Sequence, residues 1–168
     1  VWSHRKNIGT PLDTGSMLMI AEFDPVHPER LISEPKCLSR PLYGFENTEH
    51  TINNEGPYAF YYNNKIYLAY SGGDARGYLY AIGMLTANDG DDLCDLSAWE
   101  KAKTPIASFA TIPGEYGPGH NSFFWDRDQN LWIAYHAVTS FEEKIVSSGM
   151  RRVYFEQDKT PRFDVIVE

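Results

Sequence analysis

The chain has 168 residues, and its 23 acidic against 15 basic side chains leave a formal charge of −8. Such a chain has neither the basic footprint that nucleic-acid binding requires nor a polybasic segment for an anionic membrane surface. Its longest strongly apolar run, Met17 to Ala21, is far shorter than the roughly 20 residues of a membrane-spanning helix. We therefore expect no nucleic-acid partner and no membrane partner.

The first expected elements are short β-strands. Val1 to Ser3 has the pattern of a strand end, and Met17 to Phe23 is a candidate for a later strand of the same sheet. Residues 25–50 are rich in Pro and Glu and are expected to form a connection. This opening suggests that the chain is a piece of a longer protein. Its localisation therefore stays open, since any leader would precede residue 1.

An internal repeat comes next in the chain. Glu55 to Tyr70 and His120 to Tyr135 align without a gap at an offset of 65 residues. Each copy has a polar residue, an aromatic strand, a polar turn and an aliphatic-aromatic strand, which is the pattern of a β-hairpin. Trp2 matches the strand ends Tyr70 and Tyr135, and Tyr78 to Leu85 is a further strand candidate.

Units of about 65 residues with four strands each are typical of β-propeller blades with long connections. We predict an all-β partial propeller over 1–168, with about two and a half blades of four-stranded antiparallel sheets. Residues 1–50 would be the remainder of a blade truncated at its N-terminus, because its inner strand would precede residue 1. Residues 51–116 would form the blade with Glu55, and 117–168 the blade with His120 plus closing strands at Arg151 to Phe155 and Phe163 to Val167. Within the second blade, 86–118 would be largely loop, with one helical turn after Asp95.

Residues at the ends of inner strands meet at the mouth of a propeller channel, so Glu55 and His120 are predicted to face one pocket. Glu55 stands beside aromatic residues and a rigid Gly56-Pro57, which suits a general acid; the alternative is a solvated turn residue. His120 is a candidate ligand for an axial cation, a partner in a polar network, or a packed histidine.

Three further side chains are candidates for substrate binding. Tyr58 could offer a ring to a sugar face, although strand aromatics also form cores. Arg151 and Arg152 begin the last strand pair, where one could bind a hydroxyl or carboxylate while the other faces solvent. Cys37 and Cys94 form neither a CxxC nor a zinc pattern, which leaves two free thiols or one disulfide.

Four segments, in order, resemble glycoside hydrolase family 43: Asn54 to Tyr58, Tyr67 to Ser71, Tyr80 to Thr86 and Gly117 to Ser122. The Glu-Gly-Pro and Gly-Pro-Gly-His-Asn motifs together are fairly specific. The resemblance implies a five-bladed β-propeller of roughly 325 residues, of which this chain would be the C-terminal part. It implies an inverting arabinofuranosidase or xylosidase that acts on plant polysaccharides or oligosaccharides and requires no cofactor.

The resemblance assigns Glu55 as the general acid and His120 as an axial histidine near a central calcium ion or water cluster. It also implies a general-base aspartate and a second, supporting aspartate, both upstream of Glu55. None of Asp13, Asp24 or Asp74 stands in a matching position. We therefore expect the isolated chain to be catalytically incomplete and to need the missing propeller half or self-association. The alternative is a non-catalytic carbohydrate-binding propeller fragment.

Overall fold

The computed structural model describes residues 1–143 and 145–165. Two 3-10 turns, η1 (Gly44–Glu46) and η2 (Leu96–Ala98), accompany the strands, and no helix in this part of the chain is long and apolar enough to cross a membrane. The strands are β1 (Trp2–Arg5), β2 (Ser16–Ile20), β3 (Lys36–Ser39), β4 (Asn47–Thr48), β5 (Thr51–Ile52), β6 (Asn54–Tyr62), β7 (Lys65–Gly72), β8 (Ala81–Asn88), β9 (Glu100–Lys101), β10 (Tyr116–Trp125), β11 (Leu131–Val138), β12 (Val146–Arg152), β13 (Tyr154–Phe155) and β14 (Pro161–Arg162).

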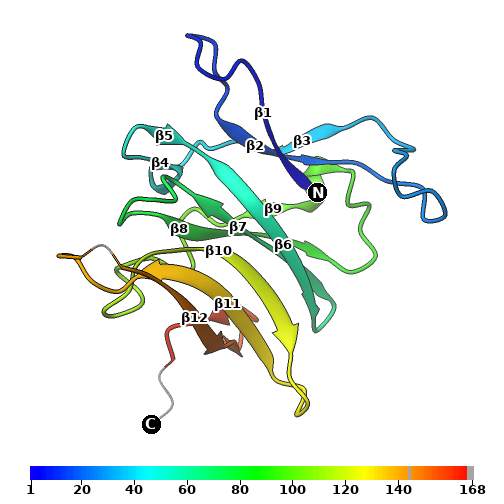
Figure 1. Ribbon diagram of the computed structural model, residues 1–168. Coiled ribbons are helices and arrows are strands. Elements are labelled where there is room, and N and C mark those ends of the chain that lie inside the picture. Colours follow the sequence, from blue (N-terminus) through cyan, green and yellow to red (C-terminus); the bar gives the residue numbers. More distant parts are fainter. Residues whose placement is uncertain (144, 166–168) are drawn as a thin grey trace.

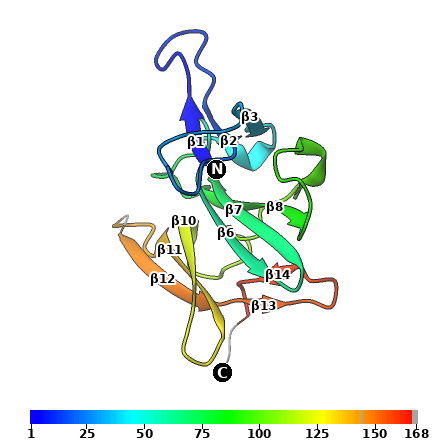
Figure 2. The ribbon, with the colours of Figure 1, turned by 90° about the vertical axis from the view of Figure 1, so that its right-hand side faces the viewer.

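Three antiparallel sheets follow one another along the chain, in the strand orders β1-β2-β3, β6-β7-β8-β9 and β10-β11-β12. The pairs β4-β5 and β13-β14 form two small ladders. The middle sheet lies between the other two, as Figures 1 and 2 show, with β6 against β1 and β2 on one side and β10 against β6, β7 and β8 on the other. Successive meander sheets stacked in chain order are the arrangement of propeller blades, which confirms the all-β prediction.

Most strands of the repeat lie where the sequence pattern places them, but the connections contain more structure than expected. The 25–50 segment includes β3 and the 86–118 segment includes β9, each an edge strand of four residues or fewer. A strand that short shows no alternation, so the sequence pattern cannot reveal it. The closing strand expected at Phe163 to Val167 is instead β14, and residues 166–168 lie outside the described part.

The central strand β7 is buried on both faces, and its alternation divides the core into two clusters. Tyr67 belongs to a cluster between the second and third sheets, where its ring stacks on Phe60 at 4.8 Å and Phe60 meets Phe123 at 4.5 Å. Tyr70 belongs to the second cluster, which includes Leu18 of the first sheet. Because neighbouring side chains of a strand point to opposite faces, one strand holds the three sheets together.

The two hairpins of the repeat pair with registers that differ by one residue. Glu55 pairs with Ser71, whereas Gly119, not His120, pairs with His136; the register shifts once along β6 and twice along β10. The second hairpin closes with the five-residue turn 126–130 in place of the two-residue turn 63–64, which shifts the pairing. In the pairing of the strands, Gly119 takes the place that the repeat predicts for His120, one residue away from the expected equivalent of Glu55.

A buried ion pair joins the connection before the second sheet to the outer strand of that sheet. The Glu46 carboxylate is fully buried and accepts hydrogen bonds from Tyr70 Oη at 2.7 Å and from the Tyr43 amide at 2.8 Å. Lys101 Nζ lies 2.6 Å from Glu46 Oε1, and burial lowers the pKa of Lys101 while Glu46 opposes that shift. A buried carboxylate needs such partners to offset its desolvation.

Candidate active site

The carboxylate of Glu55 is held by a buried tyrosine. Glu55 is the second residue of the inner strand β6, is half-buried, and accepts a hydrogen bond from Tyr80 Oη at 2.7 Å on its Oε1. Tyr80 immediately precedes β8 and is fully buried. Burial, and to a lesser extent the nearby Glu55, raises the pKa of Tyr80, so its hydroxyl stays protonated and donates to the carboxylate.

His120 lies beside the residue that follows Glu55. Its backbone has φ 51°, and its exposed imidazole is the neighbour that a side chain at Gly56 would meet first, at 3.6 Å. The His120 amide donates to Ser71 Oγ at 2.7 Å, which ties the third sheet to the end of β7. The structure thus brings the two predicted residues close together, with Glu55 near the start of β6 and His120 midway along β10.

A second histidine lies between these groups. The His136 ring is parallel to within 15° to both Tyr80, at 5.6 Å between centroids, and His120, at 6.3 Å. Burial lowers the pKa of His136, His120 adds to that effect, and Glu55 opposes it. The result is an aromatic row of Tyr80, His136 and His120 beside the Glu55 carboxylate, with a neutral imidazole in the middle at pH 7.

The other predicted substrate-binding residues lie on different parts of the third sheet and its neighbour. Tyr58 is 43% exposed, with its ring 6.1 Å from that of the core residue Phe123. Arg151 is already engaged, because Nη2 lies 2.7 Å from Glu115 Oε1 and Nε donates to Tyr135 Oη at 2.8 Å. Tyr58 is therefore more accessible to a ligand than Arg151.

Arg152 is exposed and also has protein partners. Its guanidinium donates to Asn130 Oδ1 and lies 5.1 Å from the centroid of Tyr154. The two predicted arginines thus differ in environment, since Arg151 faces a carboxylate and Arg152 faces an amide and a ring.

The structure shows no carboxylate cluster for a calcium ion around His120 in the described part of the chain. Calcium takes six to eight oxygen ligands, mostly carboxylates and carbonyls. Within the described residues, His120 belongs to no group of carboxylate, thiol or imidazole side chains close enough to share an ion. His136 Nε2 and both amide atoms of Asn121 are buried without a protein partner. Buried polar atoms of this kind are usually paired with ordered water, so a water cluster suits this region better.

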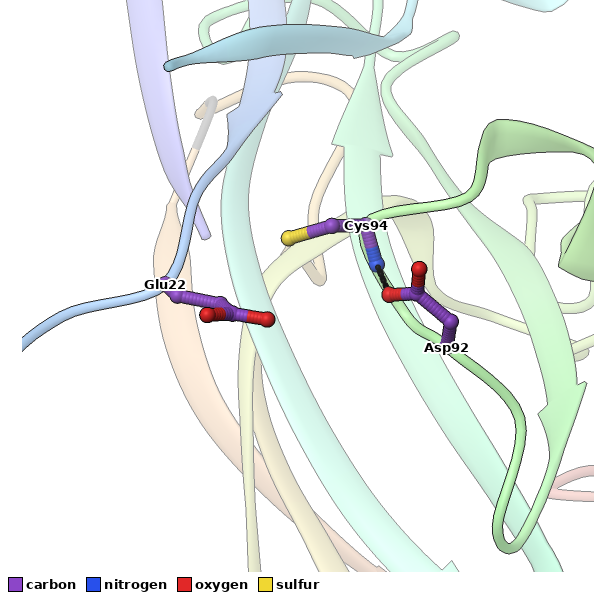
Figure 3. A group of neighbouring side chains, drawn as sticks. All are labelled: Glu22, Asp92 and Cys94. Atoms are coloured by element: carbon purple, nitrogen blue, oxygen red, sulfur yellow. Dashed lines mark hydrogen bonds between the residues drawn. The ribbon is translucent and has the colours of Figure 1, made fainter. Parts of the chain in front are cut away.

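One group of potential metal ligands occurs elsewhere in the described part of the chain. Glu22, beyond the end of β2, and Asp92 and Cys94, in the connection between β8 and β9, have ligand atoms within 4.8 Å of one another (Figure 3). Both carboxylates are exposed, and Asp92 Oδ1 accepts the Cys94 amide at 2.9 Å. Cys37 and Cys94 are free thiols. Exposed acidic groups often gather in this way without an ion.

Sequence reasoning missed three residues of the site: Ser71, Tyr80 and His136. Ser71 and His136 follow the matched tyrosines at the ends of β7 and β11, at the 65-residue offset of the repeat. Polar residues in equivalent places at strand ends were therefore the available signal. Tyr80 lies outside the repeat, and only its hydrogen bond to Glu55 reveals its place.

Comparison with known proteins agrees with this architecture. The model of the Glycosyl hydrolases family 43 matches residues 2–161. The crystal structure of an α-L-arabinofuranosidase from Lactobacillus brevis superposes with a TM-score of 0.77 at 30% identity, covering 92% of this chain and 49% of that one. A thermostable family-43 glycoside hydrolase gives 0.71 at 26% identity, covering 88% and 46%.

Two curated relatives are similar in sequence. An extracellular exo-α-(1→5)-L-arabinofuranosidase of Streptomyces avermitilis is 29% identical over 163 residues, which cover 92% of this chain and 33% of that enzyme. The enzyme with the same description from Streptomyces chartreusis is 35% identical over 126 residues, covering 74% and 37%. The chain therefore spans about a third of the length of these relatives.

These similarities define the fold class of the chain. It is an all-β chain that covers part of a five-bladed β-propeller, the fold of its solved relatives. The chain belongs to glycoside hydrolase family 43, because the family model matches nearly all of it.

Proposed function

We propose that the chain is the acid-bearing part of an inverting glycosidase that acts on arabinose- or xylose-containing oligosaccharides or polysaccharides. Membership of a glycosidase family and similarity to enzymes described as arabinofuranosidases support this substrate class. The observation that carries the proposal is Glu55, half-buried at the start of an inner strand and held at Oε1 by Tyr80.

Glu55 acts as the general acid. Its Oε1 is occupied by the Tyr80 hydroxyl, whereas Oε2 has no hydrogen-bond partner in the described part of the chain. The proton therefore passes from Oε2 to the glycosidic oxygen as the bond between that oxygen and the anomeric carbon breaks. A water molecule, deprotonated by a second carboxylate on the opposite face of the sugar, forms the new bond to carbon.

The second carboxylate comes from outside this chain. In an inverting site the two carboxyl groups lie about 6.5–9.5 Å apart. The upstream aspartates serve their own loops instead: Asp13 Oδ2 lies 2.7 Å from Arg5 Nη2, and Asp24 Oδ1 accepts the Val26 amide at 2.9 Å. The active assembly is therefore this chain with the missing part of the propeller, or with a second copy that supplies it.

The remaining predicted contacts are part of the same proposal. Tyr58 offers its exposed ring to a sugar face, and one of Arg151 and Arg152 binds a substrate hydroxyl. His120 and His136 hold an axial water cluster, which the unpartnered buried atoms of His136 and Asn121 support.

Hydrolysis of an aryl α-L-arabinofuranoside and an aryl β-D-xyloside tests the assignment of Glu55. The complete enzyme is expected to lose turnover in Glu55→Gln and to keep it in Glu100→Gln, a matched change at an exposed glutamate on β9. The isolated chain is expected to be inactive. Near-normal hydrolysis by Glu55→Gln would show that Glu55 is not the general acid. Sugar binding without any hydrolysis would favour the carbohydrate-binding alternative.

Sedimentation of the purified chain tests the assembly. A chain that remains strictly monomeric at all concentrations would exclude completion of the site by a second copy. Addition of the upstream propeller segment would then be the route to activity.

A further inference from the structure

The glycine-rich motif before His120 makes room for the tyrosine that holds Glu55. A Cβ at Gly119 would lie 2.1 Å from Tyr80 Cε1 and 2.3 Å from Cδ1, which no real side chain tolerates. A Cβ at Gly117, which has φ +59°, would lie 3.4 Å from the Tyr80 Cβ. The Tyr80 ring therefore lies directly on the backbone of β10, and the absence of a side chain at Gly119 is what admits it.

From this packing and the 2.7 Å bond between Tyr80 Oη and Glu55 Oε1, we propose that Tyr80 is a positioning residue for the general acid and that Gly119 serves by admitting its ring. The inference rests on the proposed role of Glu55. It links two sheets in one function, because Glu55 lies on β6 and Tyr80 immediately before β8 of the second sheet, while Gly119 lies on β10 of the third.

The chemical reason is the orientation of a carboxyl group. A glutamate side chain has several rotatable bonds, and proton transfer requires its acidic oxygen within hydrogen-bond reach of the leaving oxygen. A buried hydroxyl fixed on Oε1 removes that freedom and directs Oε2 alone to the substrate. Misplacement by about 1 Å can cost a factor on the order of 10² in rate. A leaving group that departs without protonation does not need this alignment.

The chain contains a second tyrosine and glutamate with nearly the same geometry, which provides a control. Tyr70 is also fully buried and donates to Glu46 Oε1 at 2.7 Å. A Cβ at Gly83 would lie 2.3 Å from Tyr70 Cζ, as one at Gly119 would lie against Tyr80. Glu46 is paired with Lys101 in the core and has no place in the proposed mechanism. The two tyrosines are therefore packed alike, whereas the carboxylates that they hold differ in burial, partners and function.

The test compares Tyr80→Phe with Tyr70→Phe in the complete enzyme. For arabinofuranosides with poor leaving groups, Tyr80→Phe is expected to lower kcat by about tenfold or more, with little change in KM. For a dinitrophenyl glycoside, whose leaving group needs no proton, the loss is expected to stay below about threefold. Tyr70→Phe is expected to reduce thermal stability without changing this dependence on the leaving group.

Gly119→Ala and Gly83→Ala provide a second comparison in which both hydroxyl groups remain. Gly119→Ala displaces the Tyr80 ring and is expected to reproduce the leaving-group dependence of Tyr80→Phe, while Gly83→Ala is not. If Tyr80→Phe lowered kcat equally for all substrates, the role of Tyr80 would be structural only, and the inference would be overturned. A Glu55→Gln enzyme that still cleaves poor leaving groups would instead overturn the proposed function.

A measurement on the chain alone separates these outcomes further. The carboxyl carbon of Glu55, observed by 13C NMR, is expected to shift in Tyr80→Phe and to stay in place in Tyr70→Phe. An unchanged Glu55 signal in Tyr80→Phe would show that the hydroxyl does not hold the carboxylate, whatever the activity of the complete enzyme.

Discussion

Lys101 Nζ lies 2.6 Å from Glu46 Oε1, and this contact joins two segments that are 55 residues apart in the sequence. Glu46 belongs to the η1 turn before the second sheet, and Lys101 to the outermost strand of that sheet. Tyr70 and the Tyr43 amide supply the remaining hydrogen bonds of the carboxylate. The contact therefore fastens the incoming connection to the sheet whose inner strand carries Glu55.

Removal of the Glu46 charge is expected to destabilise the fold strongly. Glu46→Gln leaves the Lys101 ammonium without its partner in a mostly buried place, which typically costs about 3–5 kcal/mol. Urea unfolding of the purified chain measures the loss. The control Glu100→Gln is expected to change the free energy of unfolding by less than about 0.5 kcal/mol. Glu46→Gln with Lys101→Met should recover part of the loss, and a single variant as stable as the wild type would contradict the buried pair.

The turn that closes the third-sheet hairpin is expected to open in acid. Hydrogen bonds from the side chain of Asn130 and from Trp132 Nε1 lower the pKa of Asp126 to about 2. An acid with a depressed pKa in the folded state stabilises above its ordinary pKa of 3.8, and that stabilisation is lost as the pH falls toward about 2. The indole N–H signal of Trp132 should therefore shift only below about pH 3.

Trp99 provides an internal control for that titration. Its indole Nε1 donates at 3.0 Å to the backbone carbonyl of Leu93, which does not titrate. Its signal should stay constant while that of Trp132 moves. A Trp132 signal that titrates near the ordinary carboxyl pKa would show that the Asp126 hydrogen bonds do not form.

The stability of the chain is expected to fall as the pH drops below about 6.5 because of His136. Burial lowers the pKa of His136 in the folded state below its ordinary 6.5, with His120 adding to the shift. The unfolded chain then binds a proton that the folded chain does not, so stability decreases as the pH falls below about 6.5. His136→Gln should flatten this dependence in urea unfolding. His27→Gln, at an exposed histidine, should not.

Substitutions of the two arginines predicted to bind substrate are expected to differ in their effect on the stability of the fold. Arg151→Met breaks charged hydrogen bonds to Glu115 and Tyr135 and should cost about 1.5–3 kcal/mol. Arg152→Met, at an exposed side chain, should change the free energy of unfolding by about 0.5 kcal/mol or less. KM of the complete enzyme for aryl arabinofuranosides, measured for both variants, decides which arginine binds substrate. An unchanged KM in both variants would contradict the prediction that one of these arginines binds substrate.

Several elements could be predicted because their information is local. The strands around Phe60, Tyr67 and Phe123 follow from aromatic alternation, and the turns between them from short polar segments. The position of Glu55 on an inner strand follows from the repeat, since both copies form a hairpin of the same two strands. Edge strands such as β3 and β9 carry no such pattern, because a few residues cannot show a period.

The all-β class, the repeat and the candidate acid could be read from the sequence, because hydrophobic alternation and turn chemistry act between residues close in the chain. Three contacts become visible only in the folded chain: Tyr80 bonds to Glu55, Gly119 leaves room for the Tyr80 ring, and Glu46 pairs with Lys101. These contacts join residues that are 25 to 55 positions apart and belong to different segments of the fold. Their distances depend on strand register, bulges and the packing of sheets, and a shift of one residue in the second hairpin is enough to change which residue pairs with His136.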